Sequence, residues 1–281
     1  MKKTGTKVFT VFIVMAAATL VLFAGNVGAS AQSAVMEYKN FSVILKGENT
    51  FLSYTQEGGV TDMDGASVDF DPSYAPRGEI GILFHRGLGI RYRYWTYNTN
   101  ERSADYGGVC DVDTFSWDME LFQKIRITEK NEMEWAVGFR RLNFKHYLTG
   151  SIPGHYLDSE LTAGGVTVAL EAKRKIWYGK FYARGRFSIL VGDSDIIYVQ
   201  NNSVYPYKAV DNTAYQTELA LGYELNLPLY SWGTLNVSAG GEWQNWSNIV
   251  PADTSFGGIG NDDVLEDVGF VGFVLGIGLE F

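Results

Sequence analysis

Hydrophobic and polar residues alternate along most of this chain with a period of two. In residues 217–227, Leu221 and Leu225 alternate with Glu218 and Glu224. The same alternation recurs in residues 114–127, 180–191 and 233–246. Successive side chains of a β-strand point to opposite faces, so each stretch predicts a strand with one apolar and one charged face. Strands of soluble sheets usually have about five or six residues, so these stretches are longer. Their length suits a tilted strand that crosses a bilayer.

The segments between the predicted strands alternate between short and long. The short ones are residues 85–87, 128–131, 174–178 and 228–232. The long ones are residues 55–76, 98–111, 145–160, 192–212 and 247–266. Outer-membrane barrels join their strands by short periplasmic turns and longer outer loops. The pattern therefore predicts an all-β fold, a closed antiparallel up-and-down transmembrane β-barrel.

We expect about ten strands in this barrel. They are predicted near residues 38–54, 77–84, 87–97, 112–127, 132–144, 161–173, 179–191, 213–227, 233–246 and 267–281. Bacterial barrels have an even number of strands, which ten satisfies. Residues 46–49 (KGEN) interrupt the first predicted strand, so an eight-stranded barrel without a first hairpin is the alternative.

The N-terminal segment has the features of a secretory signal peptide. Three lysines precede an apolar run, and Ala29-Ser30-Ala31 then supplies the small residues that a signal peptidase reads. The alternative is an uncleaved transmembrane anchor, because the run is nearly long enough to span a bilayer. We expect residues 1–31 to be the signal peptide and residues 32–281 to form the barrel in the outer membrane.

The chain ends on its most hydrophobic predicted strand, GFVGFVLGIGLEF, with Phe281 as the last residue. In a barrel this strand needs no protein core on its outer face, because lipid covers it and closure pairs its edge. A terminal aromatic residue after alternating apolar positions also resembles the signal read by barrel-assembly machinery. We therefore predict that Phe281 is an assembly signal, with that machinery and outer-membrane lipid as partners.

Composition narrows the partners further. The net charge of −9 argues against binding to nucleic acid. A single cysteine excludes an intrachain disulfide. Two predicted outer loops, residues 61–71 and 261–267, are acidic, but neither has the full spacing of a calcium-binding EF-hand loop. We predict solvated surface loops there, with no bound metal and no cofactor.

Charged residues gather on the polar faces of the predicted strands, and a charge that faces hydrocarbon is costly. We therefore expect the following side chains to face the lumen: Arg91, Arg93, Asp118, Glu120, Lys124, Arg126, Arg140, Glu171, Lys173, Lys180, Arg184, Arg186, Glu218, Glu224 and Glu242. They could set the selectivity of a pore for small solutes or ions, or they could form ion pairs that plug the barrel. Ten strands give a backbone diameter of about 20 Å, so we expect at best a narrow conduit.

The three histidines do not predict a catalytic site. His85 falls in a predicted short turn, whereas His146 and His155 fall in the loop that contains Asp158 and Ser159. A His–Asp–Ser set can support nucleophilic catalysis, but residues this close in one loop rarely hold the required geometry. We therefore predict no catalytic residues and expect that the protein is not an enzyme.

Several segments rich in glycine and aromatic residues resemble the pore-forming outer-membrane protein family related to the Legionella major outer membrane porin. They are RGEIGILFHRGLGIRYRYWTYNT, WAVGFRRLNF, GGEWQNW and the C-terminal GFVGFVLGIGLEF. The resemblance covers roughly residues 75–281 and implies a pore or a surface-exposed structural protein, with no catalytic residues to carry over. We predict a narrow porin-like or structural envelope protein. The alternatives are an adhesin or receptor that uses its outer loops, or a barrel enzyme that acts on lipid or peptide.

Overall fold

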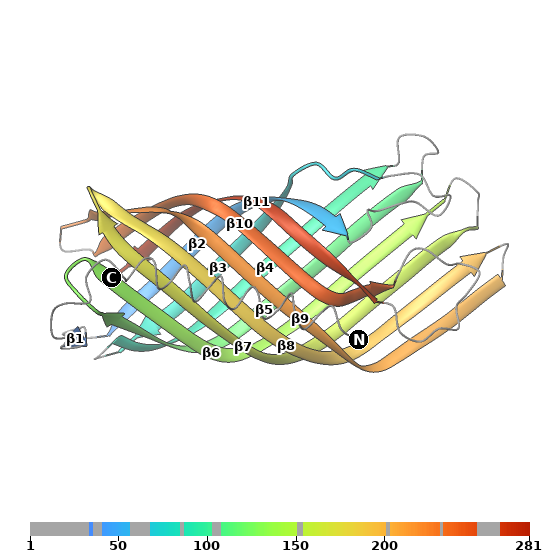
Figure 1. Ribbon diagram of the computed structural model, residues 1–281, viewed down its shortest axis with the longest axis horizontal. Coiled ribbons are helices and arrows are strands. Elements are labelled where there is room, and N and C mark those ends of the chain that lie inside the picture. The colour runs from blue at the N-terminus through green and yellow to red at the C-terminus, as the bar shows by residue number, and fades with distance from the viewer. Residues whose placement is uncertain are drawn as a thin grey trace.

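The computed structural model describes residues 34–35, 41–56, 68–84, 87–102, 108–150, 154–200, 203–230, 233–251 and 265–281. Ten antiparallel strands form a closed barrel (Figure 1). They are β2 (Ser42–Gln56), β3 (Ser73–Leu83), β4 (Leu88–Arg102), β5 (Val109–Arg126), β6 (Asn131–Thr149), β7 (Tyr156–Ile176), β8 (Gly179–Gln200), β9 (Ser203–Pro228), β10 (Thr234–Pro251) and β11 (Leu265–Glu280). Each strand pairs with its neighbours in sequence, which confirms the predicted up-and-down topology.

The seam between β11 and β2 closes the ring. It runs without a register shift from Val268 opposite Gln56 to Glu280 opposite Ile44. Two backbone hydrogen bonds continue the seam to the last residue, from Val43 N to Phe281 O (2.7 Å) and from Phe281 N to Val43 O (3.1 Å). Phe281 is therefore held in the seam, while its role as an assembly signal stays a prediction.

Residues 46–49 do not interrupt the first barrel strand. Each of them pairs with β3 on one side and β11 on the other. Lys46 and Glu48 lie on the inner face, where Lys46 Nζ contacts Glu48 Oε1 at 2.8 Å, so their charges suit a strand whose inner face is polar. The eight-stranded alternative is therefore wrong.

The strands extend further than predicted at the long-loop end of the barrel. The predicted loop 145–160 is mostly strand, since β6 continues to Thr149 and β7 begins at Tyr156. The predicted loop 192–212 is almost entirely strand, since β8 ends at Gln200 and β9 begins at Ser203. Figure 1 shows these strands reaching furthest at the end opposite to the C-terminus.

The reason for this error is a reversal of the hydrophobic pattern along the strands. On β6, Val137 and Phe139 are exposed on the outer face and Arg140 is buried inside, as expected next to lipid. Four residues further on, the outer face is polar at Lys145 and the inner face is apolar at Phe144. We refer to the section with an apolar outer face as the membrane belt, and to the section beyond it, at the long-loop end, as the outer section.

Some predicted features lie outside the described residues. These are the signal peptide, His85 and most of the two acidic loops. A further short strand, β1 (Ala34–Val35), pairs with β5 at Arg126 and Ile125, where β4 no longer covers that edge. Among the described residues, no helix is long and apolar enough to cross a membrane.

Candidate functional site: the barrel interior

An ion-pair layer fills the barrel at the level of the membrane belt. Arg77 on β3 donates to Glu242 on β10 at 2.6 and 2.9 Å and to Glu48 on β2 at 2.7 Å. Arg184 on β8 donates to the same Glu48 at 2.9 and 3.2 Å. Strands β2 and β8 are separated around the ring by β9, β10 and β11. The Arg184–Glu48 pair therefore crosses the lumen.

A second group of pairs lies beside the first. Arg140 on β6 donates to Asp118 on β5 at 2.5 and 2.8 Å and also to Glu218 on β9. Arg186 on β8 donates to Glu120 on β5, again across the lumen. Removing a charge from water costs several kcal/mol unless the charge is paired and hydrogen-bonded. Arg77, Arg140 and Arg186 each contact more than one carboxylate, which offsets the cost of burying their charges.

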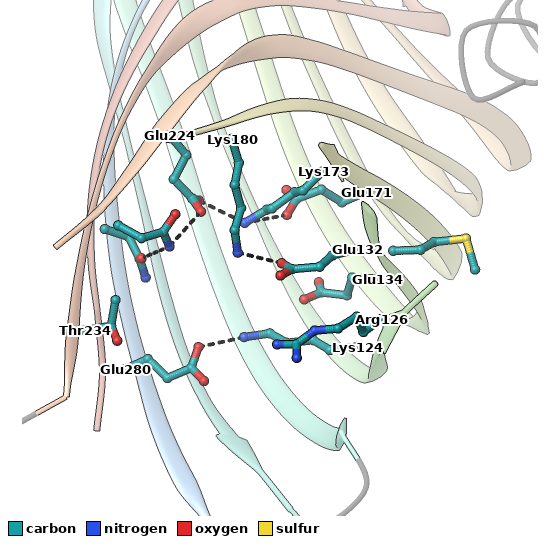
Figure 2. A pocket seen from close by; sticks show the side chains of 13 residues that line it. Lys124, Arg126, Glu132, Glu134, Glu171, Lys173, Lys180, Glu224, Thr234 and Glu280 are labelled. Atoms are coloured by element: carbon teal, nitrogen blue, oxygen red, sulfur yellow. Dashed lines mark hydrogen bonds and ion pairs between the residues drawn. The ribbon is translucent and has the colours of Figure 1, made fainter. Parts of the chain in front are cut away.

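The cavities inside the barrel become smaller from the short-turn end inwards. A cavity of about 360 Å³, which we name the vestibule, lies at that end (Figure 2). Its lining residues are Lys124, Arg126, Glu132, Met133, Glu134, Glu171, Lys173, Lys180, Glu224, Asn226, Thr234, Asn236 and Glu280. A second cavity lies deeper, beside Arg91 and Arg184, and has a volume of about 70 Å³. A third, among Arg77, Arg93 and Arg140, has a volume of about 10 Å³.

Apolar and aromatic side chains fill the outer section. Trp246 and Phe270 pack with ring centroids 5.0 Å apart, and Tyr97 lies 5.0 Å from Phe270. We name these buried side chains the outer cluster. Its members include Leu52, Tyr54, Trp95, Tyr97, Cys110, Val112, Leu142, Phe144, Leu148, Leu161, Leu190, Trp246 and Phe270. The ring centroid of Trp246 on β10 lies 5.4 Å from that of Trp95 on β4 and 5.9 Å from that of Phe144 on β6, so this packing crosses the lumen on the long-loop side of the ion-pair layer.

The charges predicted to face the lumen fall into two groups. Those in or beside the ion-pair layer are Arg91, Arg93, Asp118, Glu120, Arg140, Arg184, Arg186, Glu218 and Glu242. Those that line the vestibule are Lys124, Arg126, Glu171, Lys173, Lys180 and Glu224. Sequence reasoning missed Glu48 and Arg77, two central members of the layer. Glu48 shares the phase of Lys46 and Thr50 along β2, and this period of two was the signal that could have found it.

One of the histidines does not lie where it was predicted. His146 is on β6 rather than in a loop, and its side chain is buried in the outer section with Nε2 3.4 Å from Cys110 Sγ. Burial lowers the pKa of His146 to about 4, so the imidazole is neutral at pH 7.

The residues of a His–Asp–Ser set are not assembled. His146 and Ser159 are cross-strand neighbours and both are buried on the inner face, but Asp158 is exposed on the outer face of β7. His155 lies just before the strand begins. Within the described residues, no group of three or more His, Cys, Asp and Glu side chains is arranged to hold a metal ion.

Comparison with known proteins gives similarity in structure but not in sequence. No family model matches the chain, and no curated protein sequence matches it. The outer membrane protease OmpT from Escherichia coli is similar over 91% of this chain and 99% of its own, with a TM-score of 0.52 and 11% identity. The chain has the fold of an outer-membrane β-barrel.

Other solved barrels match less well. The translocator domain of the autotransporter NalP from Neisseria meningitidis is similar over 98% of both chains, with a TM-score of 0.47 and 10% identity. A mutant of the monoaromatic hydrocarbon channel TodX, from P. putida, is similar over 86% of this chain and 91% of its own, with a TM-score of 0.41 and 10% identity.

The similarity to OmpT corrects one prediction. We expected that the protein is not an enzyme, but a barrel of the same fold is a protease. At 11% identity the similarity concerns the fold and carries over no residue roles. The prediction of a non-enzymatic protein therefore does not stand.

Proposed function

We propose that this protein is a structural barrel of the bacterial outer membrane whose interior is occluded at rest. The observation that carries the proposal is the packing of the interior: the Arg184–Glu48 and Arg186–Glu120 pairs cross the lumen, and the outer cluster lies beyond them. A solute that crosses the lumen would meet two layers of different chemistry. The apolar outer cluster is a barrier to ions, and the ion-pair layer is a barrier to apolar solutes.

In a porin-like protein, the side chains of both the ion-pair layer and the outer cluster would have to move out of the lumen. Removing one partner from a buried ion pair costs about 3–5 kcal/mol, and the layer contains several interlocked pairs. The resemblance to the Legionella porin family favours a pore, and it stays a prediction. A conducting state would therefore have to be a rearranged one.

Planar-bilayer recording tests the proposal with protein purified from the outer membrane. We expect no steady current from the wild type. Arg184→Ala with Arg186→Ala should also remain silent, because the outer cluster still closes the lumen. Adding Trp246→Ala should open a small conductance, since both layers are then weakened. A large steady current from the wild type would overturn the occluded barrel.

The same sample should be assayed for hydrolysis of peptides, because OmpT is a protease of the same fold. Turnover that copurifies with the folded barrel would replace the structural role by an enzymatic one. The occluded barrel itself predicts only the absence of current, whatever the outcome of the peptide assay.

A second candidate function is a surface receptor or adhesin. The observation that favours it is the hairpin of β8 and β9, which projects past the last residue pair of β9 and β10, Tyr215–Ser247. Val204, Tyr205 and Tyr207 are exposed there, and tyrosine is a common contact residue in protein recognition. Shortening the hairpin should abolish surface binding and leave the barrel folded. Binding that survives this deletion would count against the hairpin as the receptor site.

A further inference from the structure

The vestibule is a blind cavity that solvent reaches from the short-turn end. The side chains of Lys124, Lys180 and Glu132 at its wall are each about a quarter exposed. Its inner end narrows into the ion-pair layer, among side chains such as Arg91 and Arg184. A volume of about 360 Å³ lies at the lower end of the range typical of ligand pockets. The cavity can therefore admit a small solute without passing it on.

Three lysine–carboxylate pairs brace the walls of the vestibule (Figure 2). Lys180 Nζ lies 2.6 Å from Glu132 Oε2, Lys173 Nζ lies 2.8 Å from Glu224 Oε2, and Lys124 Nζ lies 2.8 Å from Glu280 Oε2. Each pair joins strands that are not neighbours in the ring. The pairs therefore fix the shape of the cavity and satisfy the charges that they contain.

Two groups in the vestibule are left with unused hydrogen-bonding capacity. Arg126 is exposed to solvent at the short-turn end and has no carboxylate within ion-pair distance in the part of the chain that the structure describes; its cross-strand neighbour Glu132 is paired with Lys180. Asn226 donates through Nδ2 to Glu224 and Asn236, but its buried Oδ1 accepts no hydrogen bond from any described residue. One wall thus offers a guanidinium, and another offers a carbonyl oxygen.

We propose that the vestibule binds a short peptide-type zwitterion. Arg126 binds the ligand carboxylate, since a guanidinium presents paired donors that match a carboxylate. Asn226 Oδ1 accepts a hydrogen bond from an N–H of the ligand. The lining carries Lys124, Arg126, Lys173 and Lys180 against Glu132, Glu134, Glu171, Glu224 and Glu280. Because these charges are nearly balanced and most of them are paired, the lining does not repel a ligand whose own charges cancel.

The two groups lie on different walls of the vestibule. Arg126 is on β5 and Asn226 is on β9, with β6, β7 and β8 between them in the ring. A ligand that reaches both must span the cavity, so a dipeptide suits it better than a single amino acid. The binding site goes beyond the structural role and does not depend on whether the barrel conducts.

Calorimetric titration of the whole protein in detergent with L-alanyl-L-alanine tests this site. We expect saturable binding with one ligand per barrel. Amidation of the dipeptide carboxylate should weaken binding about tenfold or more, because a hydrogen-bonded charge pair is lost. This comparison uses the wild type alone, so it does not depend on the folding of any variant.

Arg126→Gln should weaken binding of the unmodified dipeptide to a similar extent, and Arg126→Lys should restore part of it. Lys130→Gln is the matched control, since Lys130 lies in the exposed β5–β6 turn and does not line the vestibule. Heat-modifiable gel migration establishes that each variant is folded. Absence of saturable binding would overturn the site, as would equal binding of the amidated dipeptide or unchanged binding by Arg126→Gln.

Discussion

The membrane belt and the outer section are built from the same strands with opposite patterns. On β4, Ile90 and Tyr92 face outwards in the belt while Arg91 and Arg93 face inwards. Further along the strand, Asn98 faces outwards and Tyr97 is completely buried inside. The strand does not change its pairing at this boundary, since β4 and β5 stay in register throughout.

The difference shows that the surroundings of a strand decide which face is apolar. Lipid is the apolar phase around the belt, so the polar side chains are turned inwards and must satisfy one another. Water surrounds the outer section, so the apolar side chains are turned inwards, as in a soluble barrel. One continuous sheet therefore encloses an ion-pair layer at one level and an apolar core at the next.

The largest expected difference is in the stability cost of placing methionine at an inward position of β6, first in the ion-pair layer and then in the outer cluster. Arg140→Met removes the shortest ion pairs of Asp118 and Glu218, which keep longer contacts of 3.3 and 3.7 Å to Arg186, and should cost about 3–5 kcal/mol. Phe144→Met exchanges one apolar side chain for another in the outer cluster and should cost about 1–2 kcal/mol. Urea unfolding in lipid vesicles, followed by tryptophan fluorescence, measures both. Equal costs would mean that the two interiors are not distinct.

The sequence was sufficient to predict the belt and not the outer section. Alternation such as Leu221, Gly222, Tyr223 and Glu224 identifies a strand next to lipid, and the ten strands, their order and their short turns followed from it. In the outer section the polar residues that face water, such as Lys145 and Asp158, have the composition of loops, and those strands were missed.

The contacts inside the barrel were predictable in kind but not in partner. Which strand a charge faces across the lumen depends on closure and on the stagger of the strands. The Arg184–Glu48 and Arg186–Glu120 pairs join residues far apart in sequence, so no local spacing could indicate them. The vestibule escaped prediction for the same reason, since its lining comes from seven strands.

Arginine substitutions on the outer face of β6 should show the boundary between lipid and water. Phe139 and Tyr147 are similarly exposed, at 46% and 37%, and both face outwards. Phe139→Arg places a charge in the belt and should cost about 2–4 kcal/mol if it lies near the midplane. Tyr147→Arg lies in water and should cost about 1 kcal/mol or less, mainly through its lost contact with Tyr156. The yield of heat-modifiable barrel checks both, and similar yields would place the boundary elsewhere.

The pH dependence of stability should reveal the apolar interior of the outer section. His146 has a pKa of about 4 in the folded protein, lowered by burial from the ordinary value of 6.5. Between these values the unfolded chain binds a proton that the folded protein does not, so stability falls as the pH falls below 6.5. The loss should reach about 2 kcal/mol at pH 5.

Replacing His146 by leucine isolates this contribution. Other groups also titrate in acid, so the informative quantity is the slope of unfolding free energy against pH in His146→Leu compared with the wild type. The variant should have the flatter slope between pH 7 and pH 5. Identical slopes would show that His146 is not held neutral by its surroundings.

The smallest effect concerns the edges of the sheet. In the belt the ring is closed, but among the described residues no strand pairs with β9 on its β10 side before Tyr215. Along an antiparallel hairpin, pairs whose backbone groups bond to each other alternate with pairs whose N–H groups point away from the partner strand. The pair Gln200–Ser203 closes this hairpin and is of the first kind, so the pair Ile197–Pro206, three pairs further on, is of the second kind. An N–H at position 206 would therefore point to the open edge, and proline has none.

Pro206→Val should restore that donor, change stability by about 0.5 kcal/mol or less, and increase self-association of the folded protein in detergent. Sedimentation analysis would detect the change, whereas Lys208→Arg keeps the charge at the same edge and should remain as the wild type. An unchanged oligomeric state in Pro206→Val would mean that the open edge is protected by something other than the missing donor.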